Sequence, residues 1–191
     1  MNIEKWASLP VVKYRDFWEA CFPGHGTEIV RLTAQFYKWR PVFATADPDL
    51  ERDMLEGSRW MGARSVSVSP LSRADEAQGT VGLGIDAAFS REVRARVRGS
   101  AGQRLFHEAN DAVGDAFGSV VGPPVPDVML RAWLYDLLVA AIVCVAADEL
   151  ELAAQITKVL RRWKQGHYLI GFDVSQPSPV AVVIVADAAG Q

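Results

Sequence analysis

Residues 132–147 read AWLYDLLVAAIVCVAA, and Asp136 is the only charged residue in this run. A helix that is apolar on nearly every side must be covered by other parts of the protein on nearly every side. The sequence therefore predicts a buried core helix from about residue 126 to residue 147. Its longest uncharged stretch, residues 137–147, is about half as long as a membrane-spanning helix, so no membrane segment is expected.

A helix and a β-hairpin are predicted after this run. Asp148 and Glu151 have the spacing of a capping box, and apolar residues then recur at helical spacing as far as Trp163. Residues 167–174 and 180–186 are two β-rich runs around a turn with two prolines. The second run, VAVVIVA, is apolar on both faces, which is typical of an interior strand.

The earlier part of the chain predicts more helices and short strands. Strict alternation in residues 64–69, RSVSVS, predicts a half-buried strand, whereas the polar residues 70–79, PLSRADEAQG, predict a flexible loop. Residues 90–98, SREVRARVR, fit a strand or a helix, and Ser90 followed by Glu92 favours the helix. The sequence thus predicts one globular α+β domain, residues 1–191, with six or seven helices and a small, largely antiparallel sheet.

Composition indicates an ordinary globular protein. Half of the 191 residues are hydrophobic and 23% are charged, so the chain can bury a core. The net charge of -3 gives no general attraction to nucleic acid or to an anionic membrane. Two cysteines without CxxC spacing argue against a metal knuckle or a redox pair. We expect a cytoplasmic protein because the N-terminal residues do not resemble a signal peptide, and the amino-acid usage indicates a bacterial source.

Residues 82–87, GLGIDA, match the relaxed G-x-G-x-x-A dinucleotide pattern. A working fingerprint needs a buried strand before the first glycine and a helix after the pattern. A polar stretch precedes Gly82, so we interpret the pattern as two glycines in a flexible strand and expect no cofactor.

His107, Asp111 and Asp115 are spaced by four residues, so a helix would place them in one column. In the helix of zinc proteases two histidines at this spacing hold the metal, but Asp111 stands where the second histidine would be. One nitrogen and two oxygens need further ligands to hold a metal. The sequence favours a solvated polar face, with no metal bound.

The densest group of arginines includes Arg91, Arg94 and Arg98. On a helix these three would share one face and could bind a phosphate or a carboxylate. No aromatic residue lies between them, so stacking on nucleic-acid bases is not indicated. A solvated face is the alternative that we favour. A second basic cluster at residues 158–164 complements the dipole at the end of a helix and is assigned a structural role.

Asp136 has only uncharged neighbours within one helical turn. A buried carboxylate in such surroundings needs a distant donor or has a raised pKa. Acids with perturbed pKa values are common in active sites. The interpretation that we favour is a structural ion pair with an arginine of residues 91–104, or a helix stripe that is open to water.

The sequence contains no nucleophile elbow, phosphate-binding loop or other catalytic motif. It therefore favours a non-catalytic interaction or regulatory protein, such as an adaptor, an inhibitor or an immunity-type protein that binds a protein partner. Self-association into a homo-oligomer is compatible with this hypothesis. The alternative is a small hydrolase that uses His107 with Asp111, Asp115 or Asp136. The hypothesis that the protein binds nucleic acid is supported only by the arginines, and it ranks third.

Overall fold

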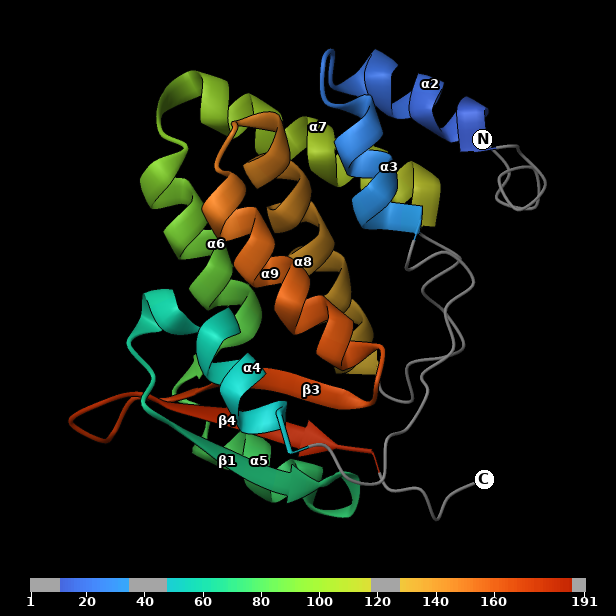
Figure 1. The fold of residues 1–191 in the computed structure, drawn as a ribbon. Helices are drawn as coiled ribbons and strands as arrows, with labels where there is room; N and C mark the ends of the chain where they lie inside the picture. Colours follow the sequence, from blue (N-terminus) through green and yellow to red (C-terminus); the bar gives the residue numbers. More distant parts are fainter. Residues whose placement is uncertain (1–10, 35–47, 118–127, 187–191) are drawn as a thin grey trace. The chain divides into compact units, whose positions relative to one another are not determined.

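The computed structural model describes residues 11–34, 48–117 and 128–186. Contacts within the chain divide it into two compact units. The helical unit consists of Met1–Trp39 and Glu92–Ala153, and the sheet unit of Arg40–Arg91 and Ala154–Gln191. Figure 1 shows the helices and strands of both. That the two units fold as one domain stays a prediction.

The predicted α+β class is confirmed. The described residues contain eight α-helices and one four-stranded sheet. The sequence predicts six or seven helices, and the additional helix lies in residues whose composition indicates a loop. Two strand pairings are antiparallel and one is parallel, so the sheet is mixed.

Four helices lie entirely in the helical unit: α2 (Val11–Cys21), α3 (Gly26–Ala34), α7 (Gly99–Phe117) and α8 (Val128–Ala146). α2 packs against α3, and α8 packs against α3 and α7. The Glu19 carboxylate closes the turn between α2 and α3, because it accepts hydrogen bonds from the backbone N–H groups of Gly24 and Gly26. A Cβ at Gly26 would lie 2.7 Å from the Glu19 backbone nitrogen, so this close approach requires glycine.

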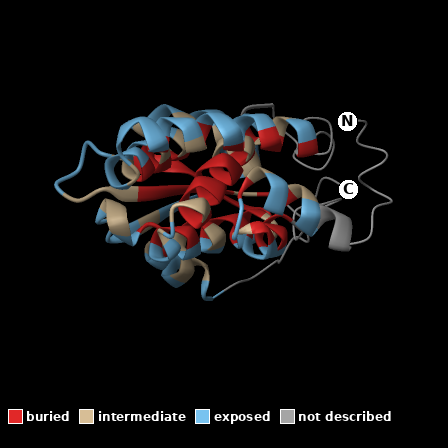
Figure 2. Ribbon diagram, turned by 90° about the horizontal axis from the view of Figure 1, so that it is seen from above, coloured by how far each residue is buried: buried red, intermediate tan, exposed pale blue. Residues whose placement is uncertain are grey.

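α8 is the core helix that the sequence predicts. Every residue from 137 to 145 is buried, and in Figure 2 such buried residues, in red, lie behind exposed helix faces in pale blue. Ala132, near the start of α8, is exposed. None of the helices in the described part of the chain is long and apolar enough to span a membrane.

The sheet has the strand order β1-β4-β3-β2, with the bounds β1 Ser65–Pro70, β2 Leu83–Gly84, β3 His167–Asp173 and β4 Val180–Val185. β3 and β4 form the predicted C-terminal hairpin, and β1 pairs with β4 in parallel. β4 is therefore an interior strand, as its sequence indicates. Its residues 181–184 are buried.

β2 and β3 approach closely at two glycines. Gly84 is the register partner of Gly171, and a Cβ at Gly171 would lie 2.4 Å from the carbonyl oxygen of Leu83. The register of β3 is also irregular between Leu169 and Gly171. Glycine in a strand commonly marks such a bulge or a close approach of two backbones.

The prediction of a loop at residues 70–79 is wrong, because most of these residues are helical. Leu71–Arg73 form the 3₁₀-helix η2, and Ala74–Thr80 form α5. Asp75 and Glu76 stand in the first turn of α5, where negative charge complements the helix dipole. Ala77 is buried, and α5 packs on β1, β3 and β4 (Figure 1). This packing outweighs the turn-rich composition, because tertiary contacts override weak local preferences.

Residues 90–98 are mainly helical, as the capping pattern favours. α6 spans Ile85–Arg96 and so begins before Ser90. Its buried residues recur every three or four positions, the period of an α-helix; they are Ile85, Ala88, Phe89 and Val93. This apolar face explains why the segment is a helix and not a strand.

α4 (Leu50–Gly57) is tied to α9 (Leu150–Trp163) by two ion pairs in the sheet unit. Asp53 pairs with Arg162, and Glu56 pairs with Lys158. Lys158 and Arg162 belong to the basic cluster at residues 158–164. Their structural role is confirmed, and it includes contacts with α4 in addition to the helix dipole.

Candidate functional site

α7 carries three of the predicted site residues on its solvent side. His107, Asp111 and Asp115 are all exposed. The Nε2 atom of His107 lies 3.5 Å from Oδ2 of Asp111, and the two side chains are 79% and 62% exposed. An exposed pair of this kind contributes about 0–1 kcal/mol, and only when the imidazole is protonated. The column predicted from the spacing therefore exists, on an open helix face.

Metal binding by this column has no further support. Within the residues that the structure describes, no three His, Cys, Asp or Glu side chains are grouped so that they could hold a metal ion. Successive members of the column are four residues apart, a rise of about 6 Å along the axis.

Tyr135 of α8 reaches the same helix, and no local sequence pattern points to it. Its hydroxyl donates a hydrogen bond of 2.6 Å to the carbonyl oxygen of Asn110 in α7. A Cβ at Gly114 would lie 3.2 Å from the same hydroxyl. The small residue at position 114 thus leaves room for the phenol between the helices, a contact between residues far apart in the sequence.

The charges of four acids act on the ionisable side chains of Tyr135 or Cys21. We call these acids the acidic face: Glu108, Asp111, Asp115 and Asp136. Burial raises the pKa of Tyr135, and the charges of Asp136, Asp111 and Asp115 raise it further. Burial also raises the pKa of the Cys21 thiol in α2, with additional effects of Asp115 and Glu108. Asp115 thus acts on both side chains, whereas Asp111 and Asp136 act on Tyr135 and Glu108 acts on Cys21.

The predicted ion pair between Asp136 and an arginine of residues 91–104 stays a prediction. Asp136 is half-buried. Arg94 lies with its Cζ 4.2 Å from the centre of the Phe106 ring. Arg96 pairs with Glu92 at 2.8 Å and with Glu149 at 3.6 Å. These contacts show that two of the candidate arginines have other neighbours.

The arginines of the predicted anion clamp are all exposed, but they do not share one helix. α6 ends at Arg96, so Arg98 lies in the connection to α7, where its Nε donates a hydrogen bond to the carbonyl oxygen of Ala95. Arg91 and Arg94 remain within α6. Helical spacing thus does not align Arg98 with them, and anion binding by this group stays a prediction.

The glycine pattern at residues 82–87 does not have the geometry of a dinucleotide fingerprint. Gly84 is the last residue of β2, and α6 begins directly after it. The backbone N–H of Gly82 donates to the carbonyl oxygen of Phe172, so both glycines pair with β3. A fingerprint needs its glycines in the turn between strand and helix. Gly84 lies in β2 and Gly82 lies just before it, so the interpretation of two glycines in a strand holds for Gly84 alone.

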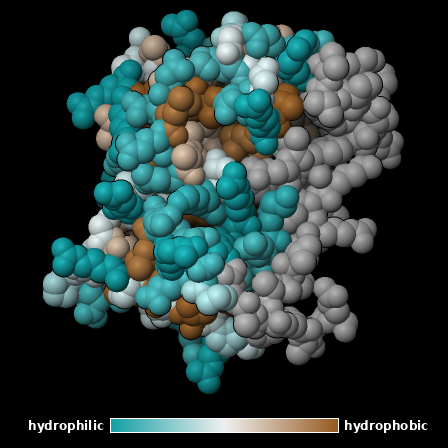
Figure 3. All heavy atoms as spheres, in the orientation of Figure 1, coloured by the Kyte–Doolittle hydropathy of each residue, from teal (hydrophilic) through white to brown (hydrophobic). Residues whose placement is uncertain are grey.

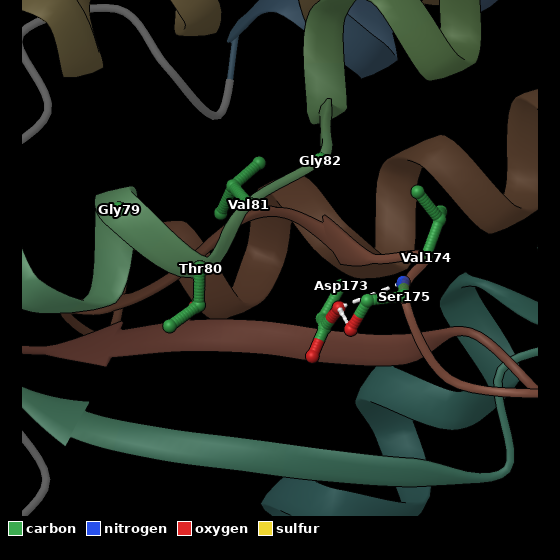
Figure 4. Close-up of a pocket in the computed structure, with 7 residues that line it drawn as sticks. All are labelled: Gly79, Thr80, Val81, Gly82, Asp173, Val174 and Ser175. Carbon is green, nitrogen blue, oxygen red and sulfur yellow. Dashed lines mark hydrogen bonds between the residues drawn. The ribbon is translucent and has the colours of Figure 1, made fainter.

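An open pocket of about 440 Å³ lies beside these glycines (Figure 4). Its lining consists of Gly79, Thr80, Val81, Gly82, Asp173, Val174 and Ser175. The Asp173 carboxylate accepts hydrogen bonds from the Ser175 backbone N–H at 2.9 Å and from its hydroxyl at 2.6 Å. These bonds lower the pKa of Asp173 and hold its carboxylate within the turn. The sequence gives no sign of this pocket because its two halves meet only in the sheet.

No known protein family matches the chain, and no curated protein or solved structure is similar to it.

Proposed function

We propose that the protein is a non-catalytic interaction protein, such as an adaptor, an inhibitor or an immunity-type protein. Its partner is a protein with a basic surface, and the acidic face binds that surface. The observation that carries the proposal is that α7 exposes three acids, Glu108, Asp111 and Asp115, whose charges act with that of Asp136 on Tyr135 or on Cys21.

Charge of one sign on a surface attracts a partner of opposite charge and accelerates the encounter. Tyrosine is enriched in protein interfaces because it combines a large ring with a hydrogen-bonding group. Glu108, Asp111 and Asp115 are exposed, so their carboxylates are available to a partner. Figure 3 shows that hydrophilic residues cover most of the coloured surface in that view.

We also propose that the protein is cytoplasmic and comes from a bacterium. Cys21 and Cys144 are both free thiols, which fits a reducing compartment. The amino-acid usage supports the bacterial source.

A small hydrolase is the second candidate, and the contact between His107 and Asp111 is the observation that favours it. A carboxylate next to an imidazole can orient the ring and raise its basicity. Both side chains are largely exposed, however, so water has free access to the pair. We therefore rank this candidate below the interaction protein.

The test is a capture experiment from the native host with tagged full-length protein. The double variant Asp111→Lys/Asp115→Lys is compared with Asp75→Lys/Glu76→Lys, which makes the same change of charge at exposed residues of α5. We expect a basic protein that is retained by the wild type and by the α5 variant and is lost with the α7 variant. Its retention should fall when the salt is raised to about 0.5 M, because salt screens exposed charges. A partner retained equally by both double variants, or no partner at all, would contradict the proposal.

A further inference from the structure

β1 is an edge strand of the sheet formed by the described residues. Among the described strands it pairs only with β4, and the opposite edge, β2, is only two residues long. Four residues of β1 are exposed: Ser65, Ser67, Val68 and Pro70. The Val68 residue is 52% exposed, although it is a large hydrophobic residue. An uncovered edge presents unpaired backbone groups that can pair with another strand.

The sequence of β1 does little to prevent such pairing. Natural edge strands are commonly protected by lysine, by proline, by a bulge or by being short. β1 carries no charge, its register with β4 is continuous over six residue pairs, and its only proline is the last residue. The edge is therefore suited to accept a strand.

The order of residues in β1 favours a second copy of the same strand. Residues 65–69 read Ser-Val-Ser-Val-Ser, which is the same in both directions. In an antiparallel pair, directly opposed residues have their side chains on the same face of the sheet. With Ser67 opposite Ser67, serine faces serine and valine faces valine along the whole segment. A two-fold axis through Ser67, perpendicular to the sheet, produces this register.

No charged residue within β1 opposes this arrangement. The nearest charged residue before the segment is Arg64. In this register the Cα atoms of the two copies of Arg64 are six residues apart along the strands, about 20 Å. That distance exceeds the Debye length of about 8 Å at physiological salt, so their repulsion is screened.

We propose that two copies of the protein associate through β1, antiparallel about a two-fold axis at Ser67, and so join two four-stranded sheets into one of eight strands. The acidic face takes no part in this interface, so the inference is independent of the proposed function. Pairing through one strand edge buries little surface, and interfaces below about 1,200 Å² are typical of weak association. The dimer should therefore form in the micromolar range.

The test is sedimentation equilibrium of the full chain from about 1 to 200 µM, the range expected for a small interface. Ser67→Lys and Ser67→Glu each place two like charges opposite one another on the axis, which is destabilising. An equimolar mixture of the two variants places opposite charges there. Gln176→Lys and Gln176→Glu are the matched controls, because Gln176 is exposed in the turn of the β3–β4 hairpin. Circular dichroism and thermal melting check that all variants fold.

We expect a dimer for the wild type and for both Gln176 variants, with at least about a tenfold weaker dimer for each Ser67 variant alone. The mixture of Ser67 variants should recover the dimer. Amide exchange of residues 65–69 in the wild type should also be slower at the high concentration than at the low one. A wild type that stays monomeric, or Ser67 variants that dimerise as tightly as the wild type, would overturn the inference. A mixture that fails to recover the dimer would do the same.

Discussion

The guanidinium of Arg162 in α9 donates hydrogen bonds from both Nε and Nη2 to one carboxylate oxygen of Asp53 in α4, 109 residues earlier in the chain. The Arg162 side chain is 8% exposed and that of Asp53 is 30% exposed. Nη1 of Arg162 also donates to the Gln165 side chain at 3.0 Å. The buried cation thus has hydrogen-bond partners in place of its water of hydration, and the contact ties α4 to the end of α9.

Asp53→Asn should destabilise the protein. It removes the charge that compensates a buried guanidinium, and we expect the free energy of unfolding to fall by about 1–3 kcal/mol. The cost stays below that of a fully buried pair because water reaches part of Asp53. Urea unfolding measures it. Asp16→Asn is the control, since Asp16 pairs with Arg15 and both are more than half exposed. Equal effects of the two substitutions would show that the Arg162 contact contributes little.

Val139→Asp should unfold the protein. Val139 is 7% exposed and lies in the fully buried part of α8, so the substitution places an uncompensated charge in the core. We expect a loss of more than about 4 kcal/mol, measured by circular dichroism and tryptophan fluorescence. Ala132→Asp introduces the same charge at an exposed position of α8 and should leave a cooperative transition. A soluble Val139→Asp protein with the wild-type melting temperature would contradict this prediction.

Two glycine substitutions should have opposite effects. Gly171→Ala places a Cβ 2.4 Å from the backbone oxygen of Leu83, so β2 and β3 must separate and stability should fall by about 1–3 kcal/mol. Gly79 lies in α5, and a Cβ at this position would meet no other atom within 4 Å. Gly79→Ala should stabilise by about 0.5–1 kcal/mol, because alanine is the better helix former. Thermal unfolding of both variants checks the signs, and a shift of the same sign for both would refute the geometric argument.

Stability should fall at alkaline pH. Burial raises the pKa of Cys144 from 9.0 to about 12 and that of Tyr168 from 10.0 to about 12. Between about pH 9 and pH 12 the unfolded chain releases protons that the folded chain retains, so the free energy of unfolding decreases as the pH rises through this range. Below about pH 8 both groups are protonated in either state, and their contribution is constant. Urea unfolding at pH values of about 8, 9, 10 and 11 measures how steeply the free energy of unfolding falls with pH.

Tyr168→Phe should reduce this alkaline slope above about pH 10, because it removes one of the two groups. At neutral pH the variant should be as stable as the wild type or slightly more stable. The Tyr168 hydroxyl is buried without a hydrogen-bond partner among the described residues, so its removal forfeits no bond and relieves a desolvated group. A loss of more than about 1 kcal/mol at pH 7 would mean that the hydroxyl has a partner.

The purified protein should contain no stoichiometric zinc. The column on α7 offers one imidazole and carboxylates on an open surface, which is a poor site for a metal that prefers nitrogen and sulfur ligands. Elemental analysis of the wild type and of His107→Ala should give the same substoichiometric value. One zinc per chain that disappears in His107→Ala would favour the hydrolase.

The core helix and the hairpin were predictable from the sequence. The apolar run at residues 137–147 is long enough to favour a buried helix, and VAVVIVA is short and rich in valine, which favours an interior strand. The physical reason is that hydrophobic periodicity records how each local segment divides its residues between water and the interior. The prediction for residues 70–79 was wrong because their composition indicated a turn. The burial of Ala77 on the sheet favours the helix that forms there instead.

The candidate site was only partly predictable. Spacing placed His107, Asp111 and Asp115 in one column, since helical geometry is local. The approach of Tyr135 to Asn110 and the bond from Arg162 to Asp53 join residues 25 and 109 positions apart. No local pattern specifies such pairs, because they depend on which helix faces meet when the core closes. The sequence by itself determined the core helix, the C-terminal hairpin and their place in the interior, but not the helix within residues 70–79. Only the tertiary structure decided which side chains share a surface, because packing between distant segments sets those contacts.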